Sequence, residues 1–185
     1  VPDQSLEGKN LEEIAEIMQT TPAEAALRIY EKSEAMVVSY GMTDEDVETF
    51  ASHPLIAVAS DGESLSTEGV LSAGKPHPRS YGTNPRFIQK YVNEKKLVSI
   101  QEAVRKMTSL PAQRLGLTNR GRLTPGYAAD IVIMDLPNVK ENATFLNPHQ
   151  YPTGITHVIV NGEIVIKDEE FTGKTPGEMI TNFNS

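Results

Sequence analysis

A short apolar run at residues 55–60 ends in the dipeptide Asp61-Gly62. The run is too short for a helix, and its continuous apolar character is typical of a strand that is covered on both faces. Asp61 would then stand at the C-terminal tip of this strand, the edge at which α/β folds and barrels place their catalytic side chains. The alternative is that Asp61 and Gly62 only open a turn, which both residue types commonly do.

Helices and strands are predicted to alternate over the first two thirds of the chain. Apolar residues recur at helical spacing behind Asn10 and Thr21, which we expect to be N-caps, and Ser99 with Glu102 forms a predicted capping box. The predicted helices lie at residues 11–18, 22–30, 44–50, 84–92 and 99–107, and the predicted strands at 35–40 and 55–60. This short repeat is typical of an α/β fold with a parallel sheet or barrel.

The last third of the chain has a different character and is predicted to be all-β. Residues 129–135 form one apolar strand, and residues 155–166 form two strands joined at Asn161-Gly162. This dipeptide between two apolar runs is the strongest short-range signal for a β-hairpin.

The composition narrows the possible partners. The net charge is −8, which disfavours binding to nucleic acid or to an anionic membrane through a general basic surface. No apolar run reaches the length of a membrane span, and the chain has no cysteine for a disulfide or a thiolate metal site. We therefore expect a cytoplasmic protein, and small anionic substrates could still bind to it through individual Arg or Lys residues.

The four histidines do not stand at a spacing that binds metal on one helix or strand. His157 falls in a predicted hairpin strand and is interpreted as structural, while His53 and His149 carry no specific signal. His77 follows Asp61 in a long predicted loop, at residues 62–82, and could reach a site there.

Arg79 lies in the same predicted loop. A guanidinium near an active site is a natural partner for a substrate carboxylate, because its planar fork binds both oxygens at once. The alternative is a solvated surface arginine. The residues alone thus predict a strand-end aspartate beside a basic loop.

Three stretches resemble the C-terminal portion of the D-aminoacylases, which are N-acyl-D-amino-acid deacylases of the amidohydrolase superfamily. They are Ala-Ser-Asp-Gly at 59–62, Lys-Pro-His-Pro-Arg-Ser-Tyr-Gly-Thr-Asn-Pro-Arg at 75–86, and Met-Thr-Ser-Leu-Pro-Ala-Gln-Arg-Leu-Gly-Leu at 107–117. Residues 121–132 and 160–162 resemble the passages in which amidohydrolases form their small β-domain.

The resemblance implies an α/β fold in two parts. Residues 1–117 would supply the last two strands and helices of a metal-dependent (β/α)8 barrel, and residues 118–185 a small β-sandwich domain. The strands around Val37 and before Asp61 would be the seventh and eighth of the barrel. The family's other metal ligands have no counterpart here, so this chain would be incomplete as a catalyst and would associate with the remainder of the barrel or with itself.

The resemblance also implies a zinc-dependent hydrolase that cleaves the amide bond of N-acyl-D-amino acids. Asp61 matches the carboxylate that takes a proton from metal-bound water and returns it to the leaving amine, and it could also be a metal ligand. Arg79 matches the arginine that binds the α-carboxylate of the substrate. The alternatives are another amidohydrolase, such as a dihydroorotase-like or hydantoinase-like enzyme, and a non-catalytic structural module.

Overall fold

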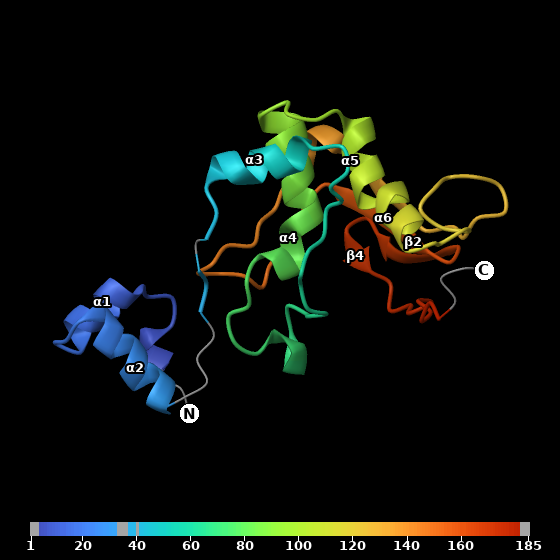
Figure 1. Cartoon of the computed structure of the whole chain (residues 1–185). Helices are drawn as coiled ribbons and strands as arrows, with labels where there is room; N and C mark the ends of the chain where they lie inside the picture. Colours follow the sequence, from blue (N-terminus) through green and yellow to red (C-terminus); the bar gives the residue numbers. More distant parts are fainter. Residues whose placement is uncertain (1–3, 33–36, 40, 182–185) are drawn as a thin grey trace.

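The computed structural model describes residues 4–32, 37–39 and 41–181, and its α-helices precede an antiparallel sheet (Figure 1). The helices are η1 (Gln4–Leu6), α1 (Leu11–Ile17), α2 (Pro22–Lys32), α3 (Asp44–Ser52), η2 (Gly69–Ser72), α4 (Arg79–Arg86), η3 (Phe87–Glu94), α5 (Ile100–Met107), α6 (Ser109–Arg114) and η4 (Leu136–Asn138). The strands are β1 (Ile131–Met134), β2 (Ile155–Val160), β3 (Glu163–Lys167) and β4 (Glu170–Phe171). None of the helices in these described ranges is long and apolar enough to cross a membrane.

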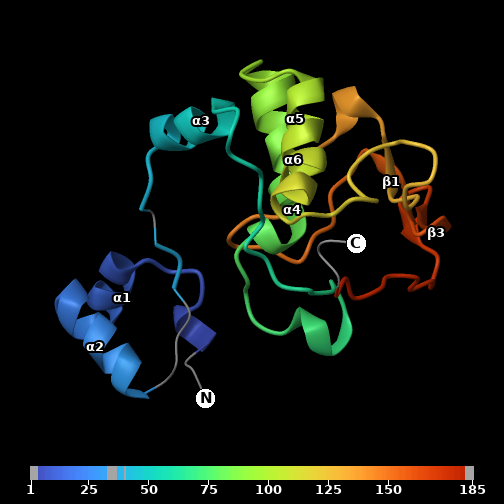
Figure 2. The same cartoon turned by 45° about the vertical axis from the view of Figure 1, so that its right-hand side comes forward.

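The helices α1 and α2 form a pair that lies apart from the rest of the chain in both views (Figures 1 and 2). Both predicted N-caps are confirmed. The side chain of Asn10 accepts a hydrogen bond from the Glu13 amide at 2.9 Å, and Thr21 Oγ1 accepts one from the amide of Glu24. The pair encloses a small core of its own, made of Ile14, Ala15 and Ala25.

A second core lies between α3, η3 and α5, and its buried members are Ala51, Phe87, Tyr91, Val92 and Ala103. The π-helix η3 continues directly from α4, so the helix expected from residue 84 begins five residues earlier, at Arg79. The predicted start was wrong because Gly82 and Pro85 are poor helix formers. Contacts with distant parts of the chain, described below, overrule that local preference.

The strand predicted at residues 55–60 is not formed among the described residues. The Val58 amide donates a hydrogen bond to the Lys106 carbonyl at 3.1 Å. The Lys106 ammonium donates to the carbonyls of His53 and Ile56. A parallel strand needs a neighbouring strand to bind its amides and carbonyls, and no described segment supplies one. For the strand predicted at 35–40, residues 37–39 form none, and 35, 36 and 40 lie outside the described residues.

The four strands form one antiparallel sheet in the order β1-β2-β3-β4. The predicted hairpin is confirmed, since Val160 pairs with Glu163 across the turn at Asn161-Gly162. The strand expected at 129–135 is confirmed as β1. The described residues thus show a small antiparallel sheet after the α-helices, while the boundary between residues 117 and 118 stays a prediction.

Candidate functional site

The structure brings together the two residues that the sequence singled out. Arg79 Nη2 lies 2.8 Å from Asp61 Oδ2, which makes an ion pair between them. The Asp61 side chain is 86% exposed and that of Arg79 is 44% exposed. Both charged groups are therefore accessible to a small molecule from solvent.

A tight corner at Asp61-Gly62 carries the carboxylate to α4. Asp61 has a φ of +46°, a left-handed conformation that aspartate tolerates better than most residues. A Cβ on Gly62 would come within 2.8 Å of Ser80 Cα, so only glycine allows this close approach. The Glu63 amide also donates to Ser80 Oγ at 3.3 Å. Asp61-Gly62 thus opens a turn, and that turn places Asp61 beside the start of α4.

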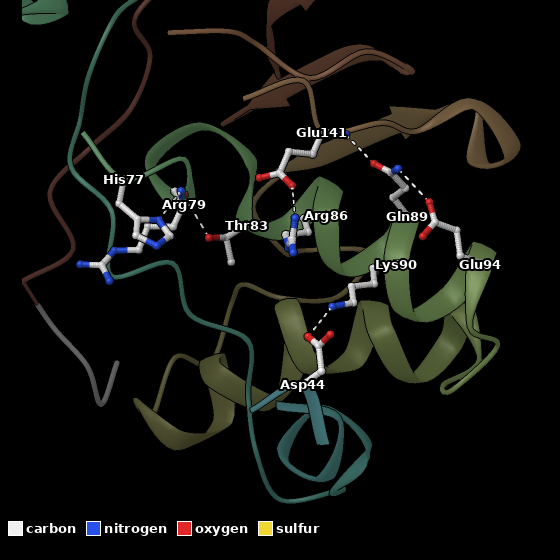
Figure 3. A network of polar contacts seen from close by, with 9 residues as sticks. All are labelled: Asp44, His77, Arg79, Thr83, Arg86, Gln89, Lys90, Glu94 and Glu141. Atoms are coloured by element: carbon white, nitrogen blue, oxygen red, sulfur yellow. Dashed lines mark hydrogen bonds and ion pairs between the residues drawn. The ribbon is translucent and has the colours of Figure 1, made fainter. Parts of the chain in front are cut away.

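Arg79 is the first residue of α4 rather than part of a loop, and its backbone is held from both sides (Figure 3). Its amide donates to His77 Nδ1 at 3.0 Å, and its carbonyl accepts from Thr83 Oγ1 at 3.0 Å. The His77 ring packs edge-on against Phe145, with 5.0 Å between ring centroids. His77 therefore satisfies an amide at the helix start, a role that the sequence did not indicate.

Burial lowers the pKa of His77 from its ordinary value of 6.5, and the nearby charge of Arg79 lowers it further. Protonation of Nδ1 would also remove the acceptor that the Arg79 amide uses. The folded protein consequently favours neutral His77.

We expect His77 to make stability fall in mild acid. Between 6.5 and the lower pKa of the folded state, the unfolded chain binds more protons than the folded chain. The contribution is complete above pH 6.5 and is lost as the pH falls from there. In urea unfolding at a series of pH values, His77→Gln should flatten the curve in this window. An unchanged slope in His77→Gln would contradict the expectation.

A segment from the sheet side of the molecule packs against α4, and the sequence did not reveal it. Glu141 Oε2 lies 2.8 Å from Arg86 Nη1, and the Glu141 side chain is only 8% exposed. A Cβ on Gly82 would come within 2.5 Å of Glu141 Oε1. Hydrogen bonding to Glu141 raises the pKa of Arg86. A glycine inside a helix was the available signal, since it often marks a close approach.

The long stretch between Asp61 and α4 is held by Tyr81 and His149. The Tyr81 hydroxyl donates to the Ser66 carbonyl at 2.7 Å and lies 2.8 Å from His149 Nδ1. His149 Nε2 lies 2.9 Å from the Gly74 carbonyl. Burial raises the pKa of Tyr81, so this hydroxyl keeps its proton. His149, which carried no signal in the sequence, thus connects this stretch to α4.

Within residues 4–32, 37–39 and 41–181, no group of three or more His, Cys, Asp or Glu side chains could hold a metal ion. His53 ends α3, and His157 lies in β2 with Nε2 3.8 Å from Asp168. Asp61 could supply one ligand, but the described residues alone do not fit a metal site.

Comparison with known proteins gives consistent matches. The profile of the amidohydrolase family matches residues 72–166. An N-acyl-D-aspartate deacylase of Alcaligenes xylosoxydans xylosoxydans is 36% identical over 91% of this chain and 32% of its own length. The structure of an N-acyl-D-glutamate deacylase from Bordetella bronchiseptica, complexed with zinc and a phosphonate inhibitor, superposes with a TM-score of 0.78 at 34% identity.

That superposition covers 89% of this chain and 33% of the deacylase. A D-aminoacylase structure that concerns a binuclear metal centre superposes with a TM-score of 0.76 at 34% identity, over 94% of this chain and 35% of that one. The chain therefore spans about a third of the length of the relatives it matches.

Proposed function

This chain belongs to the amidohydrolase family, and from that premise we propose that it is the C-terminal portion of a zinc-dependent hydrolase of N-acyl-D-amino acids. The resemblance noted in the sequence is confirmed by these relatives. The reaction would release a carboxylate and a free D-amino acid. Residues 1–117 would complete a (β/α)8 barrel and residues 118–185 a small β-sandwich domain. The observation that carries the proposal is the ion pair between Asp61 and Arg79 beside α4.

Asp61 and Arg79 suit complementary roles in amide hydrolysis. The exposed Asp61 carboxylate can take the proton of the attacking water and deliver it to the leaving amine. Arg79 contacts Asp61 through Nη2, and a guanidinium has five N–H donors in all. Its remaining donors can bind the α-carboxylate of an acylated amino acid. The pair would thus place the scissile amide next to the proton acceptor.

The metal is proposed only for the complete protein. The described residues do not fit a metal site by themselves, so no step of the reaction is assigned to a metal here. Zinc would supply a water molecule of lowered pKa and would polarise the amide carbonyl. Asp61 is the residue of this chain that could contribute a ligand.

The proposal is tested with the protein that contains this chain in its complete reading frame. Release of free amine from N-acetyl-D- and N-acetyl-L-amino acids is measured in parallel. We expect the D-enantiomers to be hydrolysed and the L-enantiomers to remain. Hydrolysis of dihydroorotate or a hydantoin instead would favour the other amidohydrolases, and no hydrolysis at all would favour a structural module.

Replacement of Arg79 by Ala should raise KM for an N-acetyl-D-amino acid by about 10- to 100-fold, the usual cost of losing a hydrogen bond to a charged group. The change in kcat should be smaller, because the α-carboxylate is bound equally in the ground and transition states. Arg79→Lys should recover only part of the loss, since lysine lacks the planar fork.

Arg28→Ala is the matched control, because Arg28 is also a partly exposed arginine in an ion pair, on α2. It should leave KM unchanged. An Arg79→Ala enzyme with the KM of the wild type would show that Arg79 is only a surface arginine.

A further inference from the structure

Arg79 can bind a carboxylate only if α4 holds its guanidinium in the right direction. We propose that Glu141 is a positioning residue, which fixes α4 through Gly82 and Arg86 and thereby directs Arg79 toward the substrate carboxylate. This inference rests on the proposed function. Glu141 itself would touch neither the substrate nor the reacting atoms.

The Glu141 carboxylate occupies the space that a side chain on Gly82 would fill. Glu141 Oε1, Cγ and Cδ would lie 2.5, 2.6 and 2.9 Å from a Cβ at that position. Its other oxygen, Oε2, pairs with Arg86 Nη1 at 2.8 Å (Figure 3). The carboxylate therefore contacts α4 at two positions, three and seven residues beyond Arg79. A buried charge in such a position is costly to leave without its partner.

The backbone around Glu141 is also fixed. The Glu141 amide donates to Gln89 Oε1 at 2.9 Å, which ties it to η3 (Figure 3). The preceding residue, Lys140, exchanges two backbone hydrogen bonds of 3.0 Å with Thr153, next to β2. The backbone at Glu141 is thus fixed by η3 and by Thr153 next to β2, and the Glu141 side chain contacts α4.

The same segment contacts the start of α4 at further points. Phe145 packs against His77, whose Nδ1 accepts from the Arg79 amide. His149 lies within hydrogen-bond distance of Tyr81. These contacts involve residues two positions on either side of Arg79, and Glu141 contributes the buried charge among the contacts. A displacement of about 1 Å at a binding group can cost up to about 100-fold in efficiency, so small movements of α4 are enough to matter.

The experiment compares two substrates in the complete protein. One is an N-acetyl-D-amino acid and the other is its carboxamide, which has no α-carboxylate. Glu141→Gln should raise KM for the acid by about tenfold, with KM for the carboxamide and both kcat values nearly unchanged. Glu141→Asp, which keeps the charge on a shorter side chain, should recover part of the preference for the acid.

Gly82→Ala provides an independent variant, because its methyl group would displace the Glu141 carboxylate. It should also raise KM for the acid, and the double variant Gly82→Ala/Glu141→Ala should lose less than the sum of the single changes. Folding of each variant is judged by near-ultraviolet circular dichroism. If Glu141→Gln does not fold, Gly82→Ala serves as the test in its place. Glu163→Gln, which removes an exposed carboxylate on β3, is the control and should change neither KM.

Equal changes for acid and carboxamide, or a change in kcat alone, would overturn the positioning role. If Arg79→Ala loses the preference for the acid and both Glu141→Gln and Gly82→Ala keep it, only the inference about Glu141 fails. If the wild type hydrolyses no N-acetyl-D-amino acid, the proposed function fails and the role of Glu141 fails with it.

Discussion

Replacement of Asp61 by Asn should lower kcat for an N-acetyl-D-amino acid by about 10²- to 10⁴-fold, the range that a positioned acid–base group contributes. Asparagine has nearly the same shape but cannot accept the proton of the attacking water. It also tolerates a positive φ, so the corner at residue 61, where φ is +46°, should remain intact. KM should change much less than kcat. Steady-state kinetics on the protein that contains this chain would measure both.

Glu63→Gln is the matched control, since Glu63 is an exposed carboxylate two residues further along the chain. It should keep the kcat of the wild type. An Asp61→Asn enzyme that loses less than about threefold would fall below the range expected of an acid–base group. Asp61 would then be only a turn residue, the alternative that its place before Gly62 left open.

Local signals in the sequence were sufficient for the elements whose determinants are close together in the chain. The capping box of Asn10 and Glu13 involves residues three apart, and the hairpin at Asn161-Gly162 pairs immediate neighbours. The N-cap at Asn10 and the hairpin were predicted correctly, because a cap or a tight turn is decided by a few adjacent residues. Ser99 likewise caps α5, although Glu102 turns its side chain to Arg105 instead of completing the capping box.

The two larger errors, the strand at 55–60 and the start of α4, concern distant partners. The apolar run at 55–60 has the composition of a strand, but a strand also needs a neighbour, and the described chain provides only α5. The start of α4 was placed too late because Gly82 looks like a loop residue until Glu141, 59 positions away, is seen beside it. A glycine can mark a close approach, but no local pattern identifies the distant residue that makes it.

The candidate pair was predicted residue by residue, but its geometry was not. Asp61 and Arg79 were chosen separately, one as a proton acceptor and one as a carboxylate ligand. The structure places them 2.8 Å apart because Gly62 packs on Ser80 at the start of α4. The roles of both residues stay predictions until the variants are measured.

Among the substitutions considered for the helices, replacement of Lys106 is expected to lower the free energy of unfolding most. Lys106 is fully buried in α5, and its ammonium donates to the carbonyls of His53 and Ile56. Burial lowers the pKa of Lys106, because the charged ammonium is held away from water. These bonds, together with the hydrogen bond from the Val58 amide to the Lys106 carbonyl, attach the segment that leads to Asp61 to the helix α5.

Lys106→Ala should therefore lower the free energy of unfolding by about 3 to 5 kcal/mol, because two carbonyls lose their donor and the packed stem is removed. Lys106→Met keeps most of the stem and should lose about 1 to 3 kcal/mol. Lys9→Met, at an exposed lysine before α1, is the control and should stay within about 0.5 kcal/mol.

Urea unfolding of the complete protein would measure these losses, and hydrogen exchange would locate them. Since the bonds of Lys106 attach residues 53–58 to α5, the Val58 amide should exchange faster in both Lys106 variants than in the wild type. Unchanged exchange at Val58 would show that other contacts hold this segment. In that case the path of the chain toward Asp61 would not depend on Lys106, and Asp61 should keep its place beside Arg79 in the Lys106→Met protein.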